Sequence, residues 1–450
     1  MSLESRILNL MVKKLKHKLN KDIQLKGLLS GSAFVLLFKI LGALSSYVFF
    51  YLLAIRWGAK GVGLFSLSFT LLSIFVVLSK LGMDSLIVKQ IPEYKAKGIH
   101  GAERSIYRRL IGVVLSFSIF ISILIYFCSN LISVFFQNPD LEPSIKLIAI
   151  AIIPSVVLSM NAECLRGLEQ MKFFAYLQNG SVMLLSVFVL MLASTLFDIG
   201  IVTPIFVYFI AVCIVAIFSM FFIHKKLPYA VLVDKSITLK ATLKTSLPML
   251  VSGAVFMIMN WTDVLMLGYY SGADQVGIYN LCFKLASIIT FAQFAINSYA
   301  APRISSYYHS DKLDELKALI SKIAWLNFII SSPFFLVLLF LGNQILPLFG
   351  EEFKSGTLVL LLLIVAQLVN ALSGPVLYIL NMTGKEFVAR NMVLVAALVN
   401  VVLNFILIPL YGIVGAAVAA SIAMVVWNIC SIVYIYKNYG LLTVVYFSSK

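Results

Sequence analysis

Charged residues are scarce in this chain of 450 residues, because Asp, Glu, Lys and Arg together make up 12% of it against 61% apolar residues. Soluble globular proteins carry roughly 25% charged residues, so there is too little polar surface here to cover a water-facing exterior. Lipid is therefore the expected solvent for most of the sequence. The long apolar runs do not alternate with polar residues. They exclude a transmembrane β-barrel and predict membrane-spanning helices of ~20 residues.

Residues for metal, redox or nucleophilic chemistry are also sparse. The five cysteines fall in or at apolar spans without any Cys-x-x-Cys spacing, and the four histidines fall in polar connections. We therefore expect no metal site, no disulfide framework and no catalytic residue. The phosphate-binding pattern Gly-x4-Gly-Lys-Ser/Thr does not occur in the sequence, so no nucleotide cofactor is expected either.

Twelve apolar segments are long enough to cross a bilayer as helices. The predicted spans lie near residues 28–55, 61–81, 110–136, 145–165, 173–196, 200–223, 246–270, 276–300, 318–348, 356–380, 387–409 and 412–436. The basic segment 1–27 precedes them, with an apolar residue at every fourth position. That pattern is typical of a helix lying on an anionic membrane surface, and a solvated basic arm fits it equally well.

Positive charge is concentrated in alternate connections. With the amino terminus inside, the inner segments hold 28 of the 35 Lys and Arg residues and the outer segments hold four. This asymmetry is the one that the positive-inside rule describes, so both termini are placed in the cytoplasm and the chain in the cell membrane. The same distribution accounts for the net charge of +16 without a basic patch, and no nucleic-acid partner is expected.

The chain contains an internal repeat. A shift of 214 residues lays Trp57–Ser73 on Ser271–Ser287, and the same shift lays Leu184 on Leu398. The identical pairs in the first stretch are Gly58/Gly272, Ala59/Ala273, Val62/Val276, Gly63/Gly277, Leu67/Leu281, Phe69/Phe283, Leu71/Leu285 and Ser73/Ser287. Since six helices per repeat is an even number, both halves insert with the same orientation. We predict an all-α fold with six-helix lobes at 28–223 and 246–436, a cytoplasmic linker at 224–245 and a cytoplasmic tail at 437–450.

Four stretches resemble the polysaccharide (oligosaccharide-lipid) flippases of the multidrug/oligosaccharidyl-lipid/polysaccharide exporter superfamily. They are Gly82–Tyr94 (GMDSLIVKQIPEY), Arg166–Lys172 (RGLEQMK), Asn381–Phe387 (NMTGKEF) and Ile406–Ala420 (ILIPLYGIVGAAVAA). The resemblance implies two V-arranged lobes around a central cavity. It also implies a transporter, not an enzyme, that flips a lipid-linked glycan precursor by alternating access. Its partners would then be a polyprenyl phosphate- or pyrophosphate-linked glycan, membrane lipids and glycan assembly proteins.

Three ionisable residues lie deep in the predicted spans, where each costs roughly 2.5–3.5 kcal/mol. Lys39 lies ~14 Å from the inner end of the first span, and a water-filled cavity is the expected place for it. Asp263 and Lys284 lie at equal distance from the turn at 272–274, so they are expected at one depth, either as an ion pair or as cavity residues. Further candidates to contact sugar are Asn260, Trp261, Asn297, Asn370, Asn400 and Asn404. The asparagines could equally join helices by hydrogen bonds.

Two other functions remain open from the sequence. A drug or cation antiporter of the same superfamily should line its cavity with carboxylates, yet Asp263 is the one deep acid among the predicted spans. A membrane glycosyltransferase or glycan polymerase usually needs acidic residues on a sizeable outer loop, and the outer connections here are short. The sequence therefore favours a glycan flippase over both.

Overall fold

The computed structural model of the protein describes residues 23–96, 101–178, 180–196, 200–227 and 239–444. Across these ranges the regular structure consists of α-helices and short 3-10 helices, and no strand occurs in them. Most of the predicted basic segment 1–27 lies outside the described residues, as do 228–238 of the predicted linker and 445–450 of the predicted tail. The boundaries predicted for these segments stay predictions.

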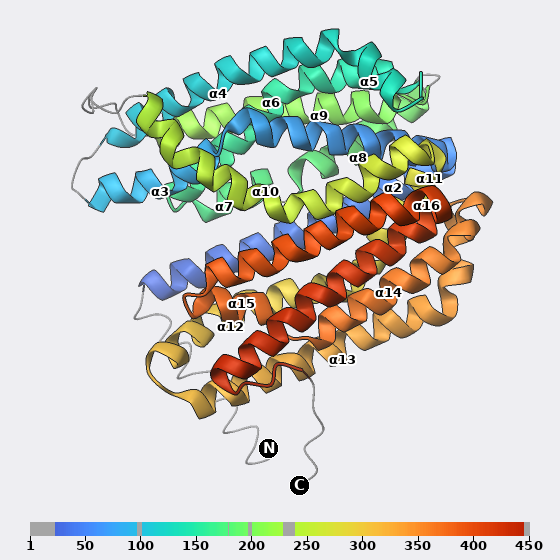
Figure 1. Cartoon of the computed structure of the whole chain (residues 1–450). Helices are drawn as coiled ribbons and strands as arrows, with labels where there is room; N and C mark the ends of the chain where they lie inside the picture. The colour runs from blue at the N-terminus through green and yellow to red at the C-terminus, as the bar shows by residue number, and fades with distance from the viewer. Residues whose placement is uncertain (1–22, 97–100, 179, 197–199, 228–238, 445–450) are drawn as a thin grey trace, which may run out of the picture.

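The first lobe comprises helices α2 to α9. They are α2 (Ile23–Lys80), α3 (Met83–Ala96), α4 (Ala102–Phe127), α5 (Ser129–Phe135), α6 (Leu141–Gly167), α7 (Met171–Gln178), α8 (Ser181–Leu196) and α9 (Thr203–Lys226). In Figure 1 helices α3 to α9 lie in the upper bundle, while the start of α2 runs along the top of the lower bundle. Helix α6 contacts α2, α3, α4 and α9. Its small residues Ser144, Ala149 and Ala162 are fully buried, and small side chains let neighbouring membrane helices approach closely.

The second lobe comprises helices α10 to α16. They are α10 (Leu239–Tyr270), α11 (Ala273–Ala286), α12 (Ile288–His309), α13 (Leu313–Ile345), η1 (Leu346–Phe349), η2 (Glu351–Gly356), α14 (Thr357–Leu372), α15 (Val376–Met382) and α16 (Glu386–Tyr439). Helix α16 packs against α10 and α14, and α13 packs against α12 and α14. The start of α10 also reaches the first lobe, since a Cβ added at Gly82 would overlap the carbonyl oxygen of Ser246. Helix α10 therefore contacts both lobes.

Two long helices each contain a sharp glycine kink. In α2 the kink is at Gly58, with φ 63°, and in α16 it is at Gly412, with φ 54°. Glycine adopts positive φ without the steric penalty that a Cβ would bring, so the chain can reverse there within one continuous stretch of helix. Each kink divides its helix into two legs that correspond to two of the predicted spans.

The predicted spans all fall on helices. Among the described residues seven helices are long and apolar enough to cross a membrane, or eight if the bent pair α7–α8 is one span. Two of the seven, α2 and α16, consist of two legs each, and α10 and the α11–α12 pair cover the remaining predicted spans. Large apolar side chains point outward from these helices, with Phe127 80% and Phe340 72% exposed. The prediction of an all-α multi-pass membrane protein is confirmed.

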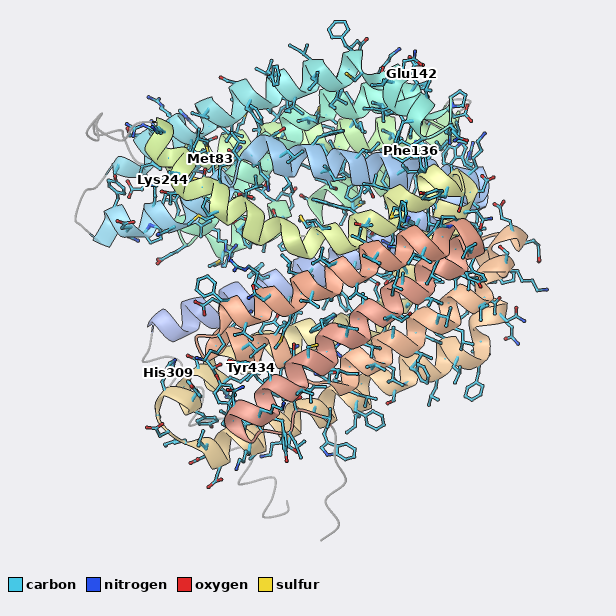
Figure 2. The ribbon with its side chains drawn as sticks, viewed as in Figure 1. Met83, Phe136, Glu142, Lys244, His309 and Tyr434 are labelled. Carbon is cyan, nitrogen blue, oxygen red and sulfur yellow. The ribbon has the colours of Figure 1, made fainter. Side chains whose placement is uncertain are left out.

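The labelled connections lie at two opposite ends of the molecule. Figure 2 shows Met83 of α3 and Lys244 of α10 at one end, and Phe136 and Glu142 at the opposite end. His309 of the second lobe lies at the same end as Met83 and Lys244. The segments predicted as inner and outer are therefore separated by the length of the helices.

Candidate functional site

The two lobes meet where the second leg of α2 packs against α11, and the contact is reciprocal. A Cβ added at Gly63 would overlap the carbonyl oxygen of Ala273, and a Cβ added at Gly277 would overlap that of Ala59. Each helix thus presents a small-xxx-small pair to the other, which allows backbone-to-backbone packing. The four residues are equivalent under the 214-residue shift. The repeat seen in the sequence is therefore placed around a pseudo-twofold contact between the lobes.

Glu352 of η2 adds a polar contact at the same end. Its carboxylate accepts a hydrogen bond from the backbone N–H of Ala59, where the second leg of α2 begins, and lies over Gly58, which has no Cβ to obstruct it. The first N–H groups of a helix lack partners and carry partial positive charge, so a carboxylate stabilises them. Sequence reasoning missed Glu352, because its partner is a backbone group 293 residues earlier.

Aromatic pairs surround this interlobe contact. The rings of Tyr51 in α2 and Phe349 in η1 meet edge to face with centroids 5.5 Å apart. The rings of Phe135 in α5 and Tyr269 in α10 lie 4.8 Å apart. We call this end of the molecule, with the glycine contact and Glu352, the outer contact. It consists of small, aromatic and helix-capping groups from both lobes.

Lys284 lies between the lobes, further along α11. Its ammonium donates a hydrogen bond to Ser46 Oγ and lies 4.2 Å from the ring centroid of Phe50 and 5.3 Å from that of Tyr47. Tyr47 OH also donates to the carbonyl oxygen of Lys284, 2.8 Å away, close to the break between α11 and α12 at Ser287. A cation of the second lobe is therefore bound by three side chains of the first.

Asp263 lies within the second lobe and has different partners. Its carboxylate accepts hydrogen bonds from Tyr279 OH at 2.6 Å, Asn400 Nδ2 at 3.0 Å and Asn404 Nδ2 at 2.6 Å. The aspartate is 3% exposed, and its three donors are buried as well. The hydrogen bonds join α10, α11 and α16 and compensate the cost of burying a carboxylate.

The predicted ion pair between Asp263 and Lys284 is therefore wrong. Equal distance from a turn places two residues at one depth, but it does not determine which way each side chain points around its helix. Lys284 points toward α2, while Asp263 points toward α16. Asn400 and Asn404 join helices through Asp263, as one of their two interpretations predicted.

The remaining candidates are dispersed. Lys39 lies half-buried on the first leg of α2, and Trp261 lies half-buried on α10. Asn370 Oδ1 accepts a hydrogen bond from Asn428 Nδ2 at 3.2 Å between α14 and α16. Asn297 is buried in α12, and the side chain of Asn260 lies outside the described part of the chain. Contact of any of these residues with a substrate stays a prediction.

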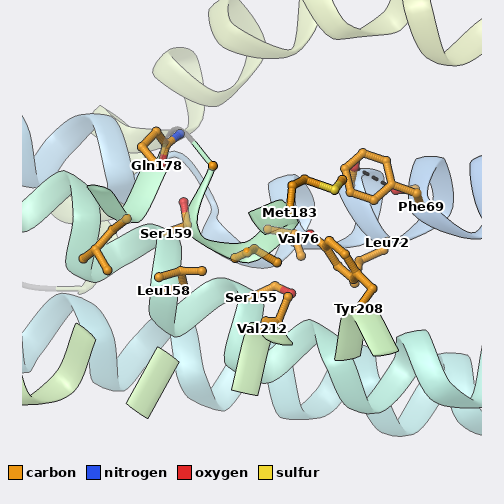
Figure 3. A pocket seen from close by; sticks show the side chains of 14 residues that line it. Phe69, Leu72, Val76, Ser155, Leu158, Ser159, Gln178, Met183, Tyr208 and Val212 are labelled. Atoms are coloured by element: carbon orange, nitrogen blue, oxygen red, sulfur yellow. Dashed lines mark hydrogen bonds between the residues drawn. The ribbon is translucent and has the colours of Figure 1, made fainter. Parts of the chain in front are cut away.

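A cavity of about 290 Å³, lined mainly by apolar side chains with a few polar ones among them, lies in the first lobe (Figure 3). Ser155 and Ser159 of α6, Gln178 of α7 and Tyr208 of α9 line it. Lys80 donates to Ser159 Oγ at 3.1 Å and pairs with Asp84 at 2.6 Å, so a cation lies behind one wall. Sequence reasoning missed this cavity, because serines in membrane helices often bond their own backbone and give no distinctive pattern.

Comparisons with known proteins agree with this architecture. The profile of the family described as polysaccharide biosynthesis protein matches residues 28–308, and the MatE profile matches residues 248–406. A curated relative, "Probable flippase AglR" of Haloferax volcanii, is 26% identical over 176 residues, which are 38% of this chain and 37% of the archaeal protein. The chain thus spans little more than a third of the length of the curated relatives it matches.

Two solved structures share the fold over almost their whole length. The lipid II flippase MurJ in an inward closed conformation superposes with a TM-score of 0.72 at 15% identity, over 90% of this chain and 87% of MurJ. An inward-facing multidrug resistance MATE family transporter of the MOP superfamily gives 0.71 at 13% identity, over 91% and 98%. The predicted two-lobe exporter fold is confirmed. Because the family profile covers more than half of the sequence, this chain belongs to the polysaccharide biosynthesis protein family.

Proposed function

We propose that the protein is a transporter that flips a lipid-linked oligosaccharide or polysaccharide precursor across the cytoplasmic membrane by alternating access. The observation that carries this proposal is the different placement of two deep charges. Lys284 lies between the lobes, whereas Asp263 is enclosed within one lobe by three hydrogen bonds. A phosphate- or pyrophosphate-linked substrate is attracted by a cation between the lobes, while an organic cation would need an accessible carboxylate.

The relatives support the same substrate class. AglR is named as a probable flippase, MurJ as a lipid II flippase, and the family as one of polysaccharide biosynthesis. We infer a glycan joined to a polyprenol by phosphate or pyrophosphate, and glycan assembly proteins as neighbours in the membrane.

The orientation follows from the distribution of charge. With both termini in the cytoplasm, the ends rich in Lys and Arg face inward, and the outer contact faces away from the cytoplasm. The structure then corresponds to a state closed on the outside. Substrate would enter from the cytoplasmic side, and its release would require the outer contact to separate.

Lys284 offers a route by which substrate could favour that separation. A phosphate that binds its ammonium competes with Ser46 and the rings of Tyr47 and Phe50. Binding would then weaken a contact between the lobes in the closed state. A ligand shifts a conformational equilibrium only by such differential contacts, so the anion and the opening are thermodynamically linked.

The test is translocation of a fluorescent lipid-linked oligosaccharide in proteoliposomes. Lys284→Gln should lower the rate about ten- to a hundredfold, the effect expected when a charged hydrogen bond worth roughly 1.5–3 kcal/mol is lost. Lys284→Arg should retain part of the activity, because the charge survives with altered geometry. Lys317→Gln is the matched control, because Lys317 is exposed on α13, and it should keep the wild-type rate. A wild-type rate in Lys284→Gln would remove the lysine from the proposed mechanism.

A drug or cation antiporter is the second candidate, favoured by the MatE match over residues 248–406. The same vesicles distinguish the two functions when they are loaded with an organic cation dye in place of the glycolipid. Glycolipid translocation without dye transport would support the proposed flippase. Dye transport that is lost in Asp263→Asn, without glycolipid translocation, would replace the proposal by the antiporter.

A further inference from the structure

A second cavity, of about 170 Å³, lies between the first leg of α2, α8 and α9. We call it the α2/α8 groove. Its walls are almost entirely apolar, and Leu41, Leu184 and Phe218 are 37%, 50% and 55% exposed along it. Because these exposed side chains are apolar and belong to membrane-spanning segments, we infer that they face hydrocarbon.

At one end of the groove, a series of aromatic contacts connects the lining residues to Lys172. Phe38 and Tyr176 line the groove and meet edge to face with centroids 5.6 Å apart. Phe38 stacks on Phe34 at 6.4 Å, and the ammonium of Lys172 lies 4.8 Å from the centroid of Phe34. Lys172 belongs to the first turn of α7, so this end is the inner end of the groove.

A second lysine reaches the same end from α9. The ammonium of Lys226, the last residue of α9, lies 5.2 Å from the ring centroid of Phe173. Phe173 lies 4.8 Å from Phe222, which in turn lies 6.5 Å from Tyr176 of the groove. Lys172 and Lys226 are thus each joined to the groove through aromatic rings, and they come from different helices.

The second lobe repeats this arrangement only in part. Under the 214-residue shift, Lys172 corresponds to Glu386 and Lys226 to Gly440, while Arg390 lies 5.1 Å from the ring centroid of Phe387, the equivalent of Phe173. The two lysines are therefore particular to the first lobe. An anionic group is the partner that their charge fits.

The groove adjoins the larger cavity of the first lobe. Gly180, at the break between α7 and α8, lines both. A Cβ at Gly180 would overlap the Cα of Gly42 in α2, so at this point only backbone lies between α2 and the break. Ser159 and Gln178 line the larger cavity together with apolar side chains, and the walls of the groove are apolar.

We propose that the α2/α8 groove holds the hydrocarbon chain of the lipid-linked substrate, with its phosphate bound by Lys172 and Lys226, before the head group enters the protein. This inference rests on the proposed flippase function. The orientation matches a lipid of the inner leaflet, with the phosphate at the inner end and the chain toward the bilayer centre. The two lysines suit the phosphate of this lipid, and the comparison with other lipids in the test below decides whether the groove is specific for it.

The test is photo-cross-linking in nanodiscs with a polyprenyl phosphate that carries a diazirine on its chain. Peptide mapping should place the label on the groove segments of α2, α8 and α9. The double variant Lys172→Gln/Lys226→Gln should reduce labelling about thirtyfold, as two interfacial lysines that each contribute about a factor of five imply. Leu184→Trp, which fills the groove, should reduce it as well.

Each variant has a matched control in the second lobe. Leu398 is the repeat equivalent of Leu184 and is 58% exposed, so Leu398→Trp should leave groove labelling unchanged. Lys317→Gln/Lys322→Gln is the control for the double lysine variant and should also leave groove labelling unchanged. Equal groove labelling by a diazirine phosphatidylglycerol, or by the uncharged polyprenol, would show a general lipid site and overturn the inference. Glycolipid translocation without groove labelling would overturn this inference alone, whereas loss of translocation itself would overturn the proposed function.

Discussion

Asp263 and Lys284 show how the surroundings of a side chain decide what a buried charge can do. The carboxylate has three buried donors within its own lobe, so little of its hydrogen-bonding capacity is left for a ligand. The ammonium has one hydroxyl and two aromatic rings as partners, and all of them belong to the other lobe. A charge whose partners lie across a moving interface must exchange them when the lobes separate. Asp263 therefore stabilises the second lobe, and Lys284 is suited to respond to substrate.

A residue-scale prediction concerns the hydrogen bonds of Asp263. Asp263→Asn places an amide donor among three existing donors, so at least one buried group loses its partner. We expect a loss of roughly 1–3 kcal/mol in the free energy of unfolding. Thermal unfolding of the purified protein in detergent measures this. Asp274→Asn at the exposed start of α11 is the control and should stay within about 0.5 kcal/mol of wild type. Equal stability of the two variants would show that the hydrogen bonds of Asp263 contribute nothing net.

At the scale of the element, the positions of the helices could be predicted from the sequence, but which side chains of neighbouring helices face one another could not. Long apolar runs and alternating charge are one-dimensional signals, and they placed each span on a helix of the structure. The rotation of a membrane helix is different, because lipid and protein interior are both apolar and a hydrophobic stripe does not mark the buried face. The Asp263–Lys284 pairing failed for this reason. The outer contact was partly visible, since its glycines belong to the clearest stretch of the repeat.

The element-scale prediction tests the glycine contact. Gly63→Ala and Gly277→Ala each insert a Cβ where a carbonyl oxygen lies, so α2 and α11 must move apart at the outer contact. Spin labels at Lys60 and Glu351, in a background without native cysteines, should report a longer distance by pulsed electron resonance. Gly112→Ala in α4 is the control, because nothing lies within 4 Å of its added Cβ. An unchanged distance in both interface variants would mean that this contact does not set the spacing of the lobes.

At the scale of the whole molecule, two lobes share one scaffold and differ in charge. The family match, the two-lobe likeness to MurJ and MATE structures and the repeat all describe the shared part. The charged residues differ between the halves. Lys172 and Lys226 belong to the first lobe, and Asp263 lies within the second. Helix α10 contacts both lobes, because its start lies against Gly82 while Asp263 near its end bonds α16. Movement of the lobes is therefore expected to bend or shift this helix.

Topology is the prediction that belongs to the molecule as a whole. Single cysteines at Lys244 and Asp311, in a background lacking native cysteines, should react only with reagents applied from the cytoplasmic side. Cysteines at Glu142 and Lys354 should react only from outside. Figure 2 places Lys244 of α10 and Glu142 of α6 at opposite ends of the molecule, so the two must label from opposite faces. Labelling of both from the same face would contradict the membrane-spanning arrangement of these helices.

Separation of the lobes at the outer contact is the central claim, and a reversible cross-link tests it most directly. Phe135 and Tyr269 belong to different lobes, and their rings lie 4.8 Å apart. Phe135→Cys/Tyr269→Cys, joined by a short disulfide-containing bifunctional reagent, should stop glycolipid translocation in proteoliposomes, and reductant should restore it. The control is Tyr308→Cys/Tyr439→Cys, whose rings lie 5.6 Å apart within the second lobe and whose cross-link should leave translocation intact. Continued translocation with Phe135→Cys/Tyr269→Cys fully cross-linked would contradict alternating access through this contact.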